Sequence, residues 1–125
     1  MPRPTPGRTL AQQYFDARQH FDRVELRRPT VRVHLAPTIY SPCYLVSIWY
    51  RPDLNPRIRV LDPQIPRDTR HLYPSGNLCV YWHEWDNTMG FGTELIPWIA
   101  EWLLTYEIWQ VTRVWGAPAH EATKE

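Results

Sequence analysis

Residues 30–61, TVRVHLAPTIYSPCYLVSIWYRPDLNPRIRVL, contain three runs of residues that favour β-strands. The runs are 30–35, 44–51 and 57–61, and in the first and last of them apolar side chains alternate with arginine or histidine. Alternation with a period of two is typical of a strand with one buried and one solvated face. The short separators contain prolines, as antiparallel connections often do. The stretch therefore predicts a meander of three or more antiparallel strands.

A helix is predicted on each side of this meander. Over residues 9–23 the apolar side chains recur at helical spacing, and Thr9 is a suitable N-cap. Beyond the meander, Pro97 is tolerated only in the first turn of a helix, so a long helix should begin near it and end by Gly116 and Pro118. This helix carries an aromatic stripe, which we interpret as a core-facing side rather than a ligand platform. The stripe consists of Trp98, Trp102, Tyr106 and Trp109.

The composition is that of one globular domain. Of the 125 residues, 43% are apolar and 14% are aromatic, which excludes a mainly disordered chain. No apolar stretch reaches the roughly 18 residues of a transmembrane helix, and no secretory signal is recognisable. Only Cys43 and Cys79 are present, so we expect a reducing, cytoplasmic environment rather than a disulfide scaffold. We expect a flexible leader over 1–8, a domain over 9–118 and a tail over 119–125.

The net charge of +1 hides an uneven distribution of charge. Residues 1–70 contain twelve arginines and six acidic residues, whereas residues 71–125 contain two basic and seven acidic residues. A basic half is compatible with a nucleic-acid surface that would include Arg57 and Arg59. The arginines are irregularly spaced and no nucleic-acid-reading motif accompanies them, so this interpretation is disfavoured. An acidic protein partner that docks on the basic half is an equally open alternative.

The segment 62–78 breaks the strand pattern and is a candidate for function. Pro63, Pro66 and Pro74 exclude a regular helix or a central strand, and long irregular segments of compact domains are often functional. The segment leads into Cys79. A nucleophilic thiol needs exposure and polar neighbours, which this turn-rich setting is expected to provide. On spacing alone, an ordinary loop cysteine is the simpler interpretation.

We expect no catalytic role for Cys43 and no metal site in this chain. Cys43 follows a proline and precedes an apolar strand, so we expect a small buried structural thiol there. His71, Cys79 and His83 suggest metal ligands, but zinc sites need three or four ligands and commonly contain a paired motif. Only Cys79-x-x-x-His83 comes close, and nothing singles out a carboxylate such as Glu84. We therefore expect that the protein needs no metal or other cofactor.

Residues 73–79, YPSGNLC, resemble the active-site segment of ubiquitin-conjugating enzymes. In that family a His-Pro-Asn tripeptide is followed by a short turn, a polar residue, an aliphatic residue and the catalytic cysteine. A tryptophan and a long helix come next, and here Trp85 falls at the expected position. The resemblance implies an α+β fold with an N-terminal helix, an antiparallel meander of three to four strands, an active-site loop and a long C-terminal helix.

The His-Pro-Asn positions are occupied here by Thr69, Arg70 and His71. The family's asparagine supports the active site and is implicated in stabilising the oxyanion. An imidazole N–H can also donate a hydrogen bond to an oxyanion, so His71 is able to take that role. The resemblance therefore implies Cys79 as the catalytic nucleophile and His71 as a second catalytic residue.

The C-terminal half is similar to a bacterial branch of the family. The runs IPWIAEWL at 96–103, YEIW at 106–109 and VWG at 114–116 resemble conjugating-enzyme domains of cyclic-oligonucleotide anti-phage (CBASS) operons. Many of those domains are fused to an adenylating enzyme domain, whereas this chain resembles the stand-alone form. The resemblance covers about residues 9–120, and its specific part lies in 69–116.

In the stand-alone branch the implied client is the operon's cyclic-oligonucleotide nucleotidyltransferase, which the conjugating protein engages and primes. The client's C-terminal carboxyl would form a thioester with Cys79, and a separate adenylating enzyme is a candidate source of activation. The client's chain end would thread a groove between the irregular segment and the loop 83–92, where Gly90 and Gly92 permit close backbone approach. Two alternatives stay open, namely a non-catalytic binding module of the same fold and a nucleic-acid-binding domain that uses the basic half.

Overall fold

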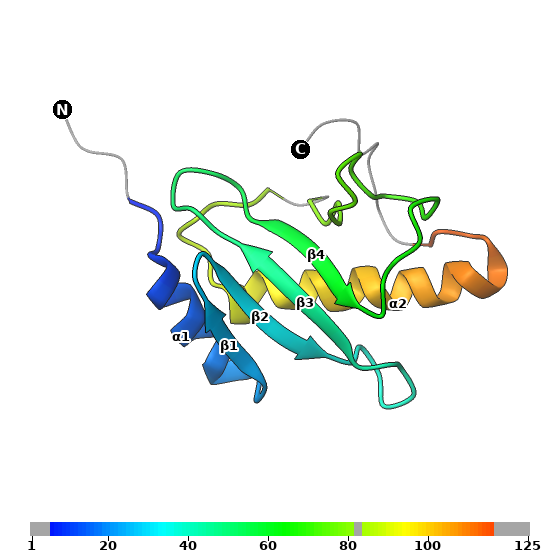
Figure 1. The fold of residues 1–125 in the computed structure, drawn as a ribbon, viewed down its shortest axis with the longest axis horizontal. Coiled ribbons are helices and arrows are strands. Elements are labelled where there is room, and N and C mark those ends of the chain that lie inside the picture. Colours follow the sequence, from blue (N-terminus) through cyan, green and yellow to red (C-terminus); the bar gives the residue numbers. More distant parts are fainter. Residues whose placement is uncertain (1–5, 82–83, 117–125) are drawn as a thin grey trace.

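A computed structural model describes residues 6–81 and 84–116, and it has the expected α+β architecture (Figure 1). In chain order the elements are α1 (Leu10–His20), β1 (Val24–Arg27), β2 (Thr30–Leu35), β3 (Tyr44–Trp49), β4 (Arg57–Asp62), a π-helical turn η1 (Phe91–Leu95) and α2 (Ile96–Thr112). Between β4 and η1 the chain is irregular, as its prolines predict.

The four strands form one antiparallel sheet in the order β1-β2-β3-β4, so neighbours in sequence are also neighbours in space. This confirms the predicted meander and adds β1, a short edge strand whose residues are only half-buried or exposed. The sheet brings apolar positions into register, because Val33 lies opposite Val46 and Val46 lies opposite Val60. All three side chains are buried on the same face of the sheet.

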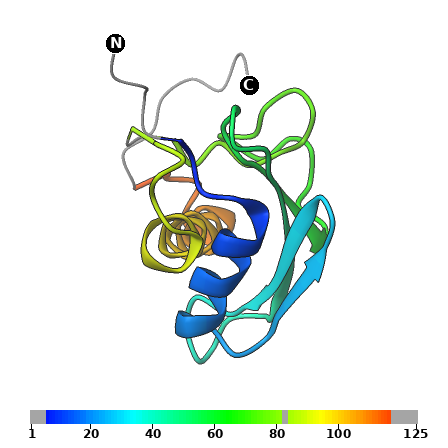
Figure 2. The same cartoon turned by 90° about the vertical axis from the view of Figure 1, so that its left-hand side faces the viewer.

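Both helices cover one face of the sheet, so the molecule has two layers (Figure 2). Apolar side chains from that face pack with those of α1 and α2 into one core, whereas the other face carries mostly polar and charged side chains together with Leu45 and Trp49. On this outer face Arg32, Ser47 and Arg59 lie side by side across three strands. Large, completely buried side chains of the core include Trp102, Phe91, Ile48, Ile58, Leu95 and Ile99.

Helix α1 begins at the predicted cap. The side chain of Thr9 accepts a hydrogen bond from Gln12 N, and the side chain of Gln12 accepts one from Thr9 N, which is a capping box. The helix ends at His20 rather than at the predicted Arg23. Phe21 already has an extended backbone, because the chain must turn there to enter β1.

Helix α1 also fixes the segment that leads into α2. The fully buried amide of Gln13 donates to Met89 O (2.8 Å) and accepts from Phe91 N (2.9 Å). A buried amide needs partners on both of its atoms, so these two bonds determine where η1 begins. Arg8, which the sequence assigns to the leader, is tied to the same region because its N donates to Asn87 O (2.7 Å).

Gly90 and Gly92 allow this segment to lie directly against α1. A Cβ atom at either position would come within 2.5 Å of an oxygen of Asp16, whose carboxylate accepts a hydrogen bond from Gly92 N (2.7 Å). The missing side chains therefore permit contact within the protein. This corrects the prediction that the two glycines serve the approach of a client chain.

Helical structure begins before Pro97. The turn η1, which was not predicted, continues directly into α2, and Pro97 lies in the first turn of α2 as expected. Trp102, Tyr106 and Trp109 are buried and Trp98 is half-buried, which confirms the aromatic stripe as a core-facing side. Among the described residues, no helix combines the length and the apolar character needed to span a membrane.

Arg113 ends α2, not the predicted Gly116. Its backbone is left-handed with φ 60°, and its N donates to Trp109 O (2.8 Å). Left-handed C-terminal positions usually hold glycine, but here the guanidinium lies over the Trp109 ring, 4.6 Å from its centre. The last two residues of the predicted domain, 117–118, and the predicted tail, 119–125, lie outside the described residues.

Candidate functional site

The candidate active site is a small hairpin, residues 71–79, closed by a glycine turn. Gly76 N donates to Tyr73 O (2.8 Å), and Tyr73 N donates to Asn77 O (2.9 Å). This is the bonding pattern of a three-residue hairpin loop whose last residue is left-handed, and Gly76 has φ 90°. The tight turn that the Pro-Ser-Gly sequence predicts is therefore confirmed.

This hairpin brings the two predicted catalytic residues together. Leu72 and Leu78 form an antiparallel bridge, and next to it Cys79 N donates to His71 O (2.9 Å). Two residues that are separated by the whole turn thus lie opposite each other in the backbone. The thiol and the imidazole therefore belong to residues that are paired in the backbone of one hairpin.

The hairpin is attached to the edge of the sheet. Leu78 N donates to Ile58 O (2.8 Å), and the Leu78 side chain is part of the core. The residue before Cys79 is therefore fixed to β4, the last strand of the sheet (Figure 1). Through Leu78 the sheet determines the position of the cysteine backbone.

His71 has a left-handed backbone, with φ 59°. Among residues other than glycine, asparagine, aspartate and histidine are enriched in this conformation. A left-handed position thus accommodates both the asparagine expected from the resemblance and the histidine present here. The imidazole ring packs on Trp115, with ring centres 4.7 Å apart, and Trp115 packs in turn on Trp102.

The exposure of the two cysteines is the reverse of the prediction. Cys43 is exposed in the loop before β3, with its Sγ 4.0 Å from Arg23 Nη1, so the expectation of a buried thiol is wrong. Cys79 is only 2% exposed. Its neighbours Leu78 and Val80 belong to the hydrophobic core cluster, whereas Cys79 is buried outside that cluster.

Two arginines that were not predicted as active-site residues hold the turn of the hairpin. Arg67 donates to Ser75 O and Pro74 O, each at 2.8 Å. Arg59 donates to Ser75 O (2.8 Å) and to the side-chain oxygen of Asn77 (3.2 Å). The alternation of β4 places Arg59 on a solvated face, but nothing local in the sequence identifies a partner 16 residues away.

Substitution of Gly76 by alanine should destabilise the protein by about 1–2 kcal/mol, the approximate cost of a left-handed backbone for an L-residue. The new Cβ would also lie 2.1 Å from Arg67 Nη1, so the guanidinium would have to move away from the turn. Urea unfolding of Gly76→Ala measures this change. Gly116→Ala is the matched control, because a Cβ there meets no atom within 4 Å. Equal unfolding free energies of the two variants would contradict the prediction.

The chain after Cys79 is anchored by Trp85, the tryptophan that the resemblance predicts. Its ring lies 6.2 Å from that of Phe91 and 6.0 Å from that of Trp98, and its indole N–H donates to the side chain of Asn87. Asn87 in turn donates to carbonyl oxygens of the β3–β4 loop, including Pro52 O at 2.8 Å. These contacts tie the loop after the cysteine to both layers of the fold.

An aromatic layer connects His71 with α2. Beyond Trp115, the ring of Trp102 stacks on Tyr106 with ring centres 5.6 Å apart. Burial raises the pKa of Tyr106, and the nearby carboxylate of Asp68 adds to this effect. Tyr106 therefore stays protonated at neutral pH and provides a neutral surface under the site.

Within residues 6–81 and 84–116, no group of three or more His, Cys, Asp or Glu side chains is arranged to hold a metal ion. His71 and Cys79, two of the candidate ligands considered from the sequence, are neighbours across the hairpin. The third, His83, lies outside the described residues.

The family of the chain follows from a comparison of its sequence with protein families. A family model described as Type II CBASS E2 protein matches residues 8–122. The chain belongs to this family. It is therefore a CBASS-associated E2-like protein, and the match spans the hairpin, the sheet and both helices. A comparison with curated proteins found no match.

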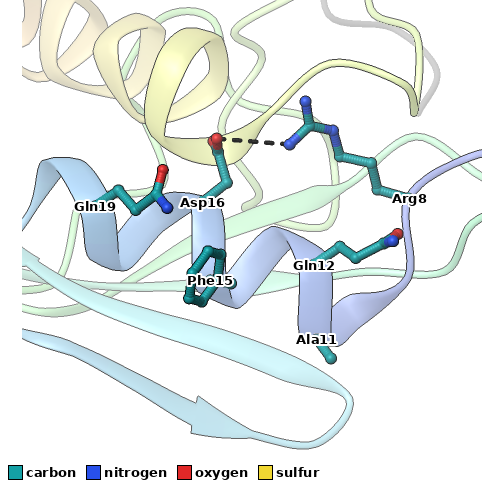
Figure 3. Close-up of a pocket in the computed structure, with 6 residues that line it drawn as sticks. All are labelled: Arg8, Ala11, Gln12, Phe15, Asp16 and Gln19. Atoms are coloured by element: carbon teal, nitrogen blue, oxygen red, sulfur yellow. Dashed lines mark ion pairs between the residues drawn. The ribbon is translucent and has the colours of Figure 1, made fainter.

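A concave region of this E2-like protein lies on α1 (Figure 3). The cavity has a volume of about 440 Å³ and is lined by Arg8, Ala11, Gln12, Phe15, Asp16 and Gln19. Helix α1 packs against β1 and β2, whereas the hairpin is bonded to β4 at the opposite edge of the sheet. The cavity is therefore separate from the candidate active site.

Proposed function

We propose that Cys79 of this CBASS E2 protein accepts the C-terminal carboxyl group of a partner protein as a thioester. The observation that supports this most is the hairpin 71–79, in which Cys79 lies opposite His71. A nucleophile and an oxyanion donor must be adjacent for acyl transfer. The partner that fits the family is the cyclic-oligonucleotide nucleotidyltransferase of a CBASS operon, which this transferase would prime in anti-phage defence.

The proposed chemistry consists of two acyl transfers. The thiolate of Cys79 attacks the carbonyl carbon of an activated carboxyl group, and the activating group leaves with the electron pair of the broken bond. A separate adenylating enzyme supplies that activation. A ring N–H of His71 donates to the oxygen that becomes negative in the tetrahedral intermediate. An amine then attacks the thioester, loses a proton and releases the Cys79 thiolate.

Loading of Cys79 requires a local opening of the site, because the residue is only 2% exposed. Short segments outside the main helices and strands open more readily than the core. We infer that the partner chain gains access by displacing neighbours of the hairpin, while Leu78 stays bonded to β4. A cysteine that is covered between reactions is also protected from other acyl donors and from oxidants.

Co-expression with the nucleotidyltransferase and the adenylating enzyme of a type II CBASS operon tests the proposal. Intact-mass measurement under acidic, non-reducing conditions should show a species equal to both proteins less one water. Treatment with a thiol should remove it, since a thioester exchanges with thiols. Absence of any such species, with all three proteins folded and present, would contradict the proposal.

A non-catalytic binding module is the second candidate, and the burial of Cys79 is the observation that favours it. Such a module would form a complex with the same partner on a native gel but would give no thiol-labile mass. The co-expression experiment therefore distinguishes the two candidates. In either case we place the protein in the cytoplasm, where reducing conditions keep Cys43 and Cys79 as thiols.

A further inference from the structure

A cavity of about 310 Å³ adjoins the turn of the hairpin. Its wall includes Arg59 from β4, Gln64, Ile65 and Arg67 from the irregular segment, and Gly76 from the turn itself. It thus touches the same hairpin that carries Cys79. We call this cavity the arginine pocket.

Two cations, Arg59 and Arg67, meet in the arginine pocket. One nitrogen of Arg59 and one of Arg67 each donate to Ser75 O at 2.8 Å, so the two guanidinium groups share a single neutral acceptor. Neither arginine forms an ion pair with any carboxylate in the described part of the chain. Like charges at this separation repel each other, and an anion placed between them removes that repulsion.

The arginine pocket also has available hydrogen-bond donors and preordered side chains with which to bind an anion. A guanidinium has five N–H donors, and each arginine uses two of them on described partners, so further donors are available. The bonds to the turn already hold both side chains, so a ligand does not have to order them. Planar guanidinium groups match a carboxylate in paired hydrogen bonds, and Ile65 offers an apolar wall for an aliphatic stem.

We propose that the arginine pocket binds an aspartate or glutamate side chain from the C-terminal tail of the client protein. The identity of the ligand rests on the proposed function, because it assumes that a protein chain end approaches Cys79. An acidic residue held against the turn fixes the register of the tail, and with it the position of the terminal carboxyl. The class of substrate is therefore a chain with an acidic residue close to its end.

Binding of a dye-labelled hexaglutamate peptide to the full-length protein tests the proposal. Arg59→Gln and Arg67→Gln should each weaken binding by about tenfold or more, since each removes one of the two guanidinium groups. Arg57→Gln is the matched control, because it removes the same charge from the same face of β4 while Arg57 lies over Trp49. We expect it to change the affinity by less than about twofold.

A second measurement uses the unsubstituted protein, so that it does not depend on how the variants fold. Backbone amide signals of Gly76 and Asn77 should shift on titration with hexaglutamate and stay in place with hexaglutamine. Absence of a shift, or equal losses for Arg57→Gln and Arg67→Gln, would overturn the proposal. Stronger binding of inorganic phosphate or of a single-stranded oligonucleotide at the same residues would also overturn it, in favour of a phosphate ligand. These binding measurements involve no thioester. A negative binding result would therefore not contradict the assignment of Cys79, and the absence of a thioester would not contradict binding of an acidic ligand to the arginine pocket.

Discussion

Substitution of Cys79 by alanine should abolish every thiol-labile adduct of this CBASS E2 protein. The sulfur that would form the thioester is then absent, and a thiol-labile bond at this position needs that sulfur. The side chain is buried, so its truncation should also lower the free energy of unfolding by roughly 1 kcal/mol. Intact mass after co-expression measures the first effect, and urea unfolding measures the second.

Cys43→Ala is the matched control for this variant. Because Cys43 is exposed, its removal should keep the adduct and leave the unfolding free energy within about 0.5 kcal/mol of the wild-type value. An adduct that persists in Cys79→Ala but disappears in Cys43→Ala would reverse the assignment of the two thiols.

Cys79→Ser should convert the labile adduct into a stable one. A serine hydroxyl would form an oxyester, which is less reactive towards amines and thiols than a thioester. The trapped species should therefore survive thiol treatment and yield to hydroxide. An added mass that is equally thiol-labile in Cys79→Ser would show that the bond is formed elsewhere.

Substitution of His71 should slow acyl transfer strongly if its ring donates to the oxyanion. The loss of one such donor typically lowers the rate by about 10²–10³, or about 3–4 kcal/mol of transition-state stabilisation. His71→Ala tests this in a single-turnover loading reaction. The variant also places alanine, which favours a left-handed backbone less than histidine does, at a φ of 59°.

Two further variants separate the chemistry of His71 from its backbone. His71→Gly removes the ring but accepts a φ of 59° without strain, so it should be as slow as His71→Ala while unfolding at a higher urea concentration. His71→Asn tolerates the same backbone and restores an N–H donor, so it should recover part of the rate. If all three rates instead followed the fraction of folded protein, His71 would be a structural residue that packs on Trp115.

Several elements could be predicted because their signals are local. The alternation in 30–35 and 57–61 and the cap at Thr9 depend on residues a few positions apart, and the structure confirms both. The turn that ends at Gly76 is equally local, since one left-handed glycine closes it. The end of α2 was predicted wrongly although its contacts are also local, because Arg113, over the ring of Trp109, takes the left-handed position that usually holds glycine.

The sequence by itself determined that a cysteine follows a glycine turn and that a histidine occupies the position eight residues before it. Only the tertiary structure decided that Cys79 lies opposite His71, that its side chain is buried, and that Cys43 is exposed instead. Exposure depends on which distant segments pack on a residue, and local sequence patterns do not show that packing. The hydrogen bonds from Arg59 and Arg67 to Ser75 O likewise depend on how the irregular segment is placed next to the sheet.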